Sequence, residues 1–487
     1  MTPHPAGTDV PGMSIMAFSR LALASAISRR GVLTGASATA LLGAWGSRFT
    51  AAGEVREYRL RAAPGLAHLR GAEGAPTQVW AYDGTVPGPE LRLKLGERLR
   101  VVFENGLPEE ATTVHWHGLR IPNAMDGVPH MTQAAVRPGE SFVYEFTPPD
   151  AGTFWYHPHE RSVIQVGRGL FGPLIVEEPE PPRVDRDVTW VLNDWRLDPN
   201  GSIRSDFLSF NDRFNEGRLG DLSTVNGRIG GPFAVRAGER IRLRLINAAV
   251  ARIFELAFEG HHPKIIALDG QPVAPHDPED ERVVIAPSQR VDLIVDMTGK
   301  PGETFKVRDK FYEGAQAQDL LSITYRDDPP LRTAPPGDPI AITDNALPEP
   351  DLAQAERLDV TFGGGGMANG VMWGEMAGGT DWSINGVALF EHSAEPLFTL
   401  RRGRSYVLRM NNKTGFHHPI HLHGHSFRVI ARGGKPTEHQ EWRDSVVMAP
   451  VERVDIAFVA DNPGDWMFHC HILDHQAFGM MTMFRVA

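Results

Sequence analysis

The residues best suited to chemistry lie near the end of the chain, around its only cysteine. His469, Cys470 and His471 are consecutive, and His475 and Met480 follow within ten residues of the cysteine. A thiolate, imidazoles and a thioether are the ligand set of a blue-copper centre, in which two histidines and a cysteine lie in one plane and a methionine binds weakly from the side. We therefore expect a copper ion beside Cys470.

The two histidines that flank Cys470 point to a second metal site. Successive side chains of a β-strand face opposite sides, so Cys470 would face one way while His469 and His471 face the other. A metal on the cysteine side would then be joined to metals on the histidine side by a few covalent bonds. The tripeptide predicts electron transfer between two metal sites.

Histidines elsewhere are paired in the same manner. A strand projects both members of a His-x-His pair to one face, where the pair can serve one metal or two adjacent metals. His418 can supply the second imidazole of the Cys470 site. The eight paired imidazoles exceed what one ion binds, so they predict a multinuclear site. The pairs are His115/His117, His157/His159, His421/His423 and His469/His471.

Three copies of one unit must position these side chains. The segment 91–105 recurs at 233–247 and at 398–412, and in each copy an asparagine stands nine positions after a glycine. Between them, apolar and charged residues alternate, which predicts a strand with one buried face. The glycine indicates a turn between two strands.

A second repeat joins only the outer units. Residues 152–159 match 464–471, and residues 115–118 match 421–424. The middle unit lacks these histidines, although its segment 289–293 parallels 452–456. We expect the middle unit to keep the scaffold without the metal, and the multinuclear site to lie between the first and last units.

Composition agrees with an all-β protein. Helical periodicity is scarce, and 50 glycines and 38 prolines among 487 residues suit short strands joined by turns. Proline-rich stretches at 177–183 and 327–350 indicate linkers. We predict consecutive Greek-key β-sandwich or barrel domains at 53–180, 181–335 and 336–487, after a leader at 1–52. One cysteine allows no intrachain disulfide.

The leader suggests export. Arg29 and Arg30, followed by a small, apolar stretch to about Ala44, resemble a twin-arginine signal. That stretch is too short and too weakly apolar for a membrane span. We expect the twin-arginine machinery as a partner and a periplasmic or otherwise exported monomer. The true start and the cleavage site stay open. A net charge of −11 argues against nucleic acid as a partner.

On these motifs the sequence resembles the three-domain multicopper oxidases, the laccase and cuprous-oxidase group, over essentially the whole mature chain. The resemblance implies three cupredoxin-like domains and four copper ions, of which one is type 1, one type 2 and two type 3. Carried over residue by residue, it makes His115 and His421 the type 2 ligands. The type 1 ligands would be His418, Cys470, His475 and Met480, and the type 3 ligands His117, His157, His159, His423, His469 and His471.

The resemblance also implies an activity. A small reductant, either a phenol, an aromatic amine or a metal ion such as Cu(I), would give up single electrons at the type 1 copper. The electrons would pass through Cys470 to His469 and His471, and O2 would be reduced to water. Met480 as a weak axial ligand implies a lower potential than a non-coordinating residue would give.

Two acidic residues match positions near the coppers of related enzymes. Asp126 is a possible proton relay, although a turn-forming Asp-Gly pair explains it equally well. Asp444 matches a position near the type 1 copper and is a possible substrate contact, although we favour an ordinary surface carboxylate. Gln476 stands where some bacterial relatives carry a proton-delivering glutamate, and it cannot titrate.

The choice of reductant stays open at this point. Residues 363–379 hold Met367, Met372 and Met376 among glycines, which indicates either a reduced copper-acquisition loop or, as we favour, a plain glycine-rich loop. Met448, Met481 and Met483 suit core packing. Two other functions are considered: a copper-free relative acting in envelope assembly, which would have lost ligands, and a copper nitrite reductase, which typically has two domains.

Overall fold

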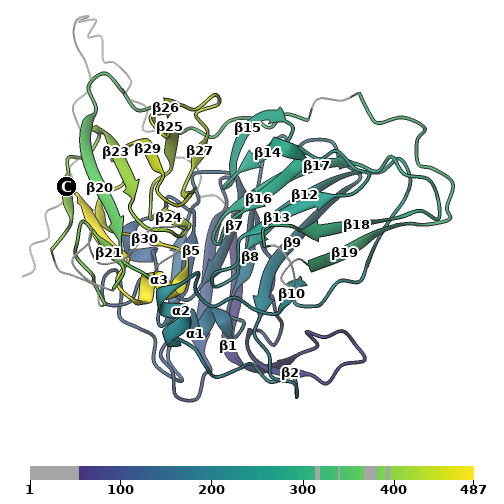
Figure 1. Ribbon diagram of the computed structural model, residues 1–487, viewed down its shortest axis with the longest axis horizontal. Coiled ribbons are helices and arrows are strands. Elements are labelled where there is room, and N and C mark those ends of the chain that lie inside the picture. Colours follow the sequence, from purple (N-terminus) through teal and green to yellow (C-terminus); the bar gives the residue numbers. More distant parts are fainter. Residues whose placement is uncertain (1–53, 313–317, 338–339, 367–380, 391–394) are drawn as a thin grey trace, which may run out of the picture. The chain divides into compact units, whose positions relative to one another are not determined.

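The computed structural model describes residues 54–312, 318–337, 340–366, 381–390 and 395–487. The predicted export signal and Met367, Met372 and Met376 lie outside these residues. In the described part, strands dominate and form three successive pairs of sheets, as the all-β prediction expected (Figure 1). None of the helices described is long and apolar enough to cross a membrane.

The first domain packs two four-stranded sheets, β2-β1-β4-β6 and β3-β8-β7-β5, around a core of aliphatic and aromatic side chains. Because β5 pairs with β7, the two His-x-His pairs of the first domain lie side by side, and His115 stands opposite His157. The elements are β1 (Val55–Ala67), β2 (Thr77–Tyr82), β3 (Leu91–Lys94), β4 (Arg98–Asn105), β5 (His115–His117), η1 (Asn123–Met125), β6 (Ser141–Phe146), β7 (Gly152–His157), α1 (Ser162–Gly167) and β8 (Gly172–Glu177).

The middle domain has a six-stranded sheet, β10-β9-β12-β17-β14-β15, and a five-stranded sheet, β11-β19-β18-β13-β16. Its own apolar core lies between them. The elements are β9 (Arg186–Trp195), α2 (Phe210–Phe214), β10 (Leu222–Val225), β11 (Pro232–Val235), β12 (Arg240–Asn247), β13 (Phe254–Phe258), β14 (Lys264–Leu268), β15 (Gln271–His276), η2 (Glu279–Glu281), β16 (Arg282–Ile285), β17 (Arg290–Asp296), β18 (Thr304–Asp309) and β19 (Gln318–Tyr325).

The third domain has a seven-stranded sheet, β21-β20-β23-β29-β25-β26 with β27 on β25, and a five-stranded sheet, β22-β31-β30-β24-β28. In the second sheet β24 pairs with β30, which sets His421 opposite His469. The elements are β20 (Glu356–Gly363), β21 (Ser383–Ile384), β22 (Phe398–Leu400), β23 (Ser405–Asn412), β24 (His418–Leu422), β25 (Phe427–Arg432), β26 (Lys435–Pro436), β27 (Trp442–Arg443), β28 (Ser445–Met448), β29 (Arg453–Val459), β30 (Gly464–Cys470), α3 (Leu473–Ala477) and β31 (Met481–Val486).

The threefold repeat is confirmed at its glycine and at its asparagine. Gly96, Gly238 and Gly403 each join two strands and have φ values of +92°, +81° and +76°, which glycine adopts at no steric cost. The asparagine is buried in every copy. Its amide NH2 donates to two backbone carbonyls and its amide oxygen accepts a backbone N–H two residues on. The asparagines are Asn105, Asn247 and Asn412.

The expectation of one buried face is wrong for the middle copy. Every residue of β12 is buried, including Arg242 and Arg244. Arg242 donates to Glu178 of the first domain (2.6 Å), and Arg244 donates to the hydroxyl of Thr153 in β7 (2.9 Å). The charged face of this strand is buried because it packs against the first domain.

Candidate metal centre

The thiol of Cys470 lies at the end of β30, among imidazoles from two other elements. Its Sγ is 3.6 Å from Nδ1 of His418 and 3.8 Å from Nδ1 of His475, and these two nitrogens are 3.1 Å apart. All three side chains are fully buried. Donor atoms that share one ion in a trigonal plane, at bond lengths of about 2.0 Å for nitrogen and 2.3 Å for sulfur, stand about 3.5–3.7 Å apart. The group therefore fits a single metal ion.

Hydrogen bonds turn both imidazoles toward the thiol. The Nε2–H of His475 donates to the carbonyl of Asn215, and that of His418 donates to Oγ1 of Thr414, each at 2.7 Å. The hydroxyl of Thr414 in turn donates to Asn412. With Nε2 protonated, each Nδ1 presents its lone pair to the metal. Met480 is buried beside them, and its carbonyl accepts the N–H of Cys470 at 3.0 Å.

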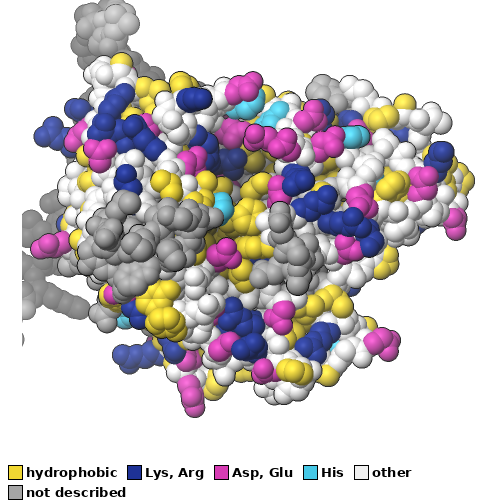
Figure 2. Space-filling model, in the orientation of Figure 1, with side chains coloured by type: hydrophobic (Ala, Val, Ile, Leu, Met, Phe, Trp, Pro, Cys, Tyr) yellow, Lys and Arg dark blue, Asp and Glu magenta, His cyan; other side chains and the backbone are white. Residues whose placement is uncertain are grey.

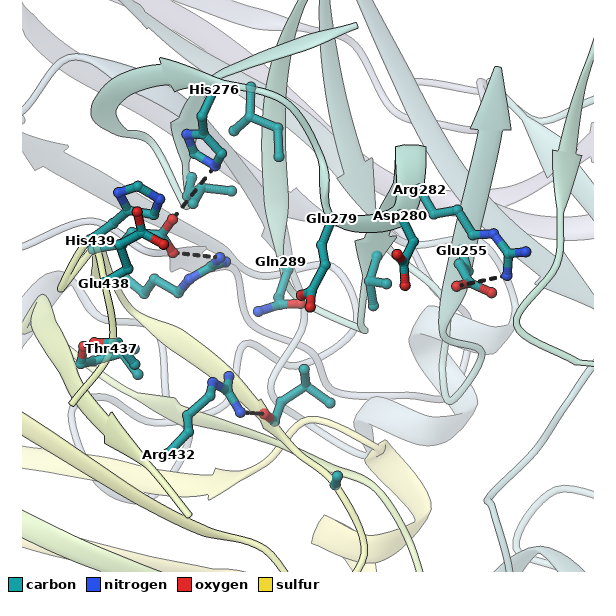
Figure 3. Close-up of a pocket in the computed structure, with 18 of the residues that line it drawn as sticks. Glu255, His276, Glu279, Asp280, Arg282, Gln289, Arg432, Thr437, Glu438 and His439 are labelled. Atoms are coloured by element: carbon teal, nitrogen blue, oxygen red, sulfur yellow. Dashed lines mark hydrogen bonds and ion pairs between the residues drawn. The ribbon is translucent and has the colours of Figure 1, made fainter. Parts of the chain in front are cut away.

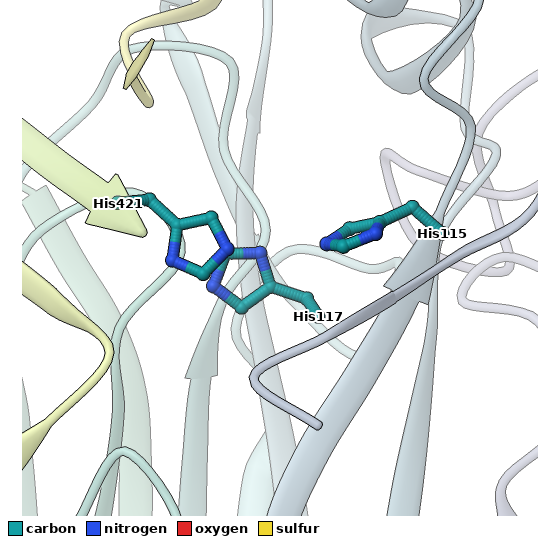
Figure 4. Close-up of side chains that lie close together, drawn as sticks. All are labelled: His115, His117 and His421. Atoms are coloured by element: carbon teal, nitrogen blue, oxygen red, sulfur yellow. The ribbon is translucent and has the colours of Figure 1, made fainter. Parts of the chain in front are cut away.

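The two neighbours of Cys470 face the other side of the strand, as the alternation of side chains predicts. There, three groups of histidines each bring one ring nitrogen per residue to within 4.8 Å of the others. Figure 4 shows one group, in which rings from β5 of the first domain and β24 of the third domain converge. The groups are His115/His117/His421, His117/His157/His471 and His159/His423/His469.

The ring nitrogens of this cluster that have no hydrogen-bond partner are suited to bind metal ions. Buried polar atoms are nearly always hydrogen-bonded, yet many of these ring nitrogens have no partner. Burial, and then the neighbouring histidines, lower the pKa of His117, His159 and His471, so these rings are neutral and can act as ligands. The unpartnered atoms are Nε2 of His115, His157 and His421, Nδ1 of His117, and both ring nitrogens of His159 and His471.

Asp126 lies inside this cluster, 1% exposed. Its backbone carbonyl accepts the Nδ1–H of His115 at 2.7 Å, and its carboxylate accepts the Nδ1–H of His423 at 2.9 Å. The turn interpretation also holds, because Asp126 ends η1 and precedes Gly127, whose φ is +79°. Asp126 therefore orients two histidines from different domains, and a role in proton delivery stays a prediction.

The interpretation of Asp444 as a plain surface carboxylate is wrong, whereas a role as a substrate contact stays a prediction. Its side chain is 2% exposed and lies at the histidine cluster, with Oδ1 3.3 Å from Nε2 of His117. Its carbonyl accepts the Nδ1–H of His421 at 2.8 Å. Burial alone would raise the pKa of Asp444, but the guanidinium of Arg290, with which it forms a bidentate ion pair, lowers it well below the usual range. The carboxylate is thus buried as an anion.

Sequence reasoning missed the contribution of the middle domain. Arg290 begins β17, is fully buried and also donates to the carbonyl of Asp269. Ser445 accepts a hydrogen bond from Ser288 of the middle domain, and Asn215 of the same domain orients His475. One signal was present, because the segment 289–293 keeps the Arg-Val-Asp sequence of 452–456 although the middle unit lacks the histidines. The middle domain supplies none of the histidines in the groups above, but it holds their partners in place.

Comparison with known proteins identifies the family. The description "Multicopper oxidase" applies to matches over residues 67–181, 186–324 and 366–487. The chain belongs to the multicopper oxidase family. It is 33% identical over 443 residues to Multicopper oxidase MmcO of Mycobacterium tuberculosis, covering 82% of each chain. It is also 30% identical over 454 residues to Laccase-1 of Botryotinia fuckeliana, covering 85% of this chain and 79% of the relative.

Solved structures agree. The crystal structure of a multicopper oxidase from Pseudomonas thermotolerans is 35% identical, with a TM-score of 0.79 over 89% of this chain and all of that one. The three cupredoxin-like domains expected from the sequence are therefore confirmed. Copper is the cofactor, and the protein is an O2-dependent oxidase. A copper-free relative and a two-domain nitrite reductase are both disfavoured by this family membership and by the assembled ligand groups.

The arrangement explains how a multicopper oxidase divides its work. Copper supplies one-electron chemistry at the Cys470 group and O2 reduction at the histidine cluster. The backbone of Cys470 connects the two, because the residues on either side of it belong to the second group. Burial keeps bulk water from both groups. Asp126 and Asp444 accept hydrogen bonds from ring N–H groups of His423 and His421 and so fix the orientation of these rings.

Proposed function

We propose that this multicopper oxidase is a laccase-type enzyme that oxidises phenols and aromatic amines outside the cytoplasm. The observation that carries the proposal is the buried group of His418, Cys470 and His475, in which Cys470 has a histidine of the cluster on each side of it in the chain. Such a site takes single electrons from a reductant and passes them on without releasing intermediates. Twelve residues of this chain match the family's copper ligands, and a relative that aligns with 85% of this chain is a laccase.

Cu(I) as the main reductant receives less support. Cu(I) prefers thioether and thiolate ligands, so a dedicated cuprous oxidase needs accessible methionines. Met367, Met372 and Met376 lie outside the residues that the structure describes. Of the described methionines considered for this role, Met448, Met481 and Met483 are 0%, 7% and 2% exposed; Met448 packs in the core of the third domain and Met481 against Val128 of the first. These thioethers serve packing rather than capture of an ion.

Export through the twin-arginine machinery, delivery to the periplasm or beyond, and a monomeric state complete the proposal. Its support is the Arg29–Arg30 pair before a small, apolar stretch. That machinery carries folded proteins, which suits an enzyme that must bind its copper in a buried site.

The test is O2 uptake by the copper-loaded protein with a phenol and with Cu(I), each with and without a copper chelator. The proposal predicts phenol-dependent O2 consumption that the chelator does not reduce. Phenol turnover that needs added free copper would contradict it and favour a cuprous oxidase. Fusion of residues 1–52 to a reporter, compared with an Arg29→Lys, Arg30→Lys variant, tests the export route.

A further inference from the structure

A large cavity lies between the middle and third domains, and none of the cluster histidines lines it. Its volume is about 840 Å³. Figure 3 shows its two walls, with Glu279 and Asp280 on the middle-domain side and Glu438 and His439 on the third-domain side. Figure 2 shows acidic side chains and histidines gathered on the surface near β14 and β15. The cavity is large enough for an aromatic molecule and far larger than a bare ion requires.

Part of the wall of this cavity is apolar. Ile265 and Leu268 of β14 and Val429 of β25 are buried in its wall, and Phe311 and Val447 are partly buried there. Aromatic rings bury favourably against such side chains. The walls therefore suit the ring of an organic reductant.

The rim of the cavity is negatively charged. Seven carboxylates line it against three guanidinium groups. Each guanidinium already has a carboxylate partner, in the pairs Arg282–Glu255 (3.2 Å), Arg432–Glu452 (3.0 Å) and Arg443–Glu441 (3.1 Å), and Asp277 pairs with Lys264 (2.7 Å). Glu279, Asp280 and Glu438 are exposed and form no ion pair with any residue that the structure describes. The rim thus keeps uncompensated negative charge, which attracts cations.

The cavity also reaches the electron-accepting site. Its wall includes His417, whose ring packs edge-on against Phe311 at 5.3 Å. The next residue in the chain is His418, which would hold the type 1 copper together with Cys470. A molecule in contact with His417 is therefore separated from a type 1 ligand by one peptide unit. His475, the other imidazole of this group, is instead capped by the carbonyl of Asn215.

We propose that this cavity is an electron-entry site for aromatic reductants that carry a positive charge, such as phenols with an alkylammonium side chain. The acidic rim binds the ammonium group, the apolar wall packs against the ring, and His417 and His418 carry the electron. The inference rests on the proposed function. Each phenol loses one electron and its hydroxyl proton and becomes a phenoxyl radical. Four electrons and four protons reduce one O2 to two waters.

The experiment compares three catechols of similar ring chemistry on the copper-loaded enzyme: dopamine (cationic), 4-methylcatechol (neutral) and 3,4-dihydroxyphenylacetate (anionic). In the variant Glu279→Gln, Asp280→Asn, Glu438→Gln we expect kcat/KM for dopamine, relative to that for the anion, to fall about fivefold or more through KM. The neutral catechol should be unaffected. The control variant Glu73→Gln, Glu109→Gln, Glu180→Gln removes as many exposed charges elsewhere and should leave the ratio unchanged.

A binding measurement separates this inference from turnover. Calorimetry with 2-phenylethylammonium, which has no phenol to oxidise, should show binding to the copper-free protein that weakens about fivefold in the rim variant. An unchanged catechol ratio or unchanged binding in the rim variant, or an equal loss in the control variant, overturns the inference. If the neutral catechol is still oxidised, the proposed function stands without it. Failure to oxidise any catechol overturns both.

Discussion

At the scale of single residues, each of six copper-ligand histidines is oriented by a hydrogen bond from the ring nitrogen that points away from the metal site. Four cluster histidines donate Nδ1–H to a backbone carbonyl, which leaves Nε2 to face the centre. His418 and His475 show the opposite arrangement, with Nε2–H bonded and Nδ1 facing Cys470. Ring orientation is thus set before any metal binds. The four bonds run from His115 to Asp126, His157 to Pro158, His421 to Asp444 and His469 to Cys470.

Thr414→Val should weaken copper binding beside Cys470. The valine has nearly the same shape but cannot accept the Nε2–H of His418, so the ring loses the bond that orients it. Loss of such a partner typically lowers metal affinity by about 10–100-fold. A copper titration followed by the blue absorbance of the thiolate–copper bond measures the effect. Thr414→Ser keeps the hydroxyl and should bind as the wild type does; equal binding by the valine variant would contradict the role given to Thr414.

The copper-free protein should lose stability in mild acid. Burial lowers the pKa of His475 to about 3, whereas a histidine in the unfolded chain has a pKa of about 6.5. The unfolded state then takes up a proton that the folded state cannot, so stability is lost as pH falls below about 6.5. For this residue the free energy of unfolding should drop by about 2 kcal/mol between about pH 7 and pH 5.

Urea unfolding of the copper-free protein at both pH values measures this loss. His475→Asn removes the titrating group and should show a pH dependence that is smaller by about the same 2 kcal/mol. An identical pH dependence in the variant and the wild type would show that His475 is not the residue that titrates.

At the scale of elements, the same buried asparagine occurs in all three domains, and in the third domain it has a second role. The buried asparagine that ends each repeated strand fixes the following turn through hydrogen bonds of its amide. In the third domain this turn leads directly into β24, and the oxygen of Asn412 also accepts the hydroxyl of Thr414. A structural feature common to all three domains therefore positions a copper ligand in one of them.

Asn412→Ala and Asn247→Ala form a matched pair. Each leaves buried backbone groups without partners and should lower the free energy of unfolding by about 1–3 kcal/mol. Only Asn412→Ala should also alter the visible spectrum of the blue copper, because Asn247 lies in the middle domain. Denaturant unfolding and absorption spectra of both variants test this. A normal blue spectrum in Asn412→Ala would contradict the positioning role.

At the scale of the whole molecule, the three domains are joined through buried polar contacts as well as apolar ones. Trp155 of the first domain, Val191 of the middle domain and Leu473 of the third belong to one buried cluster. Close by, the β12 arginines of the middle domain reach Glu178 and Thr153 of the first. The middle domain thereby supports the metal centre without providing the histidine groups.

Glu178→Gln should destabilise the protein by about 3 kcal/mol, because it removes one anion from a buried group of charges that includes Arg242. The neighbouring Glu177→Gln is its control. Glu177 pairs with Arg92 at 3.3 Å on a partly exposed surface, where an ion pair contributes about 0–1 kcal/mol. Thermal and denaturant unfolding of both variants measure the difference. Equal small losses would show that the buried pair does not join the domains.

Much of this protein could be derived from its sequence alone. The histidine pairs, the cysteine between two of them and the threefold repeat led to the domain class, the cofactor and the family. They did so because ligand type and alternation along a strand are local properties. A strand places neighbouring side chains on opposite faces whatever surrounds it. The placement of Cys470 on one face and of His469 and His471 on the other therefore follows from the tripeptide sequence alone.

What only the tertiary structure decided concerns contacts between distant segments. Asp444 was expected at the surface, yet it is buried because Arg290, 154 positions earlier, compensates its charge. Arg242 and Arg244 likewise follow an exposed-strand pattern and are buried by another domain. Whether a charge faces water or a partner depends on packing between domains, and no local pattern records that choice.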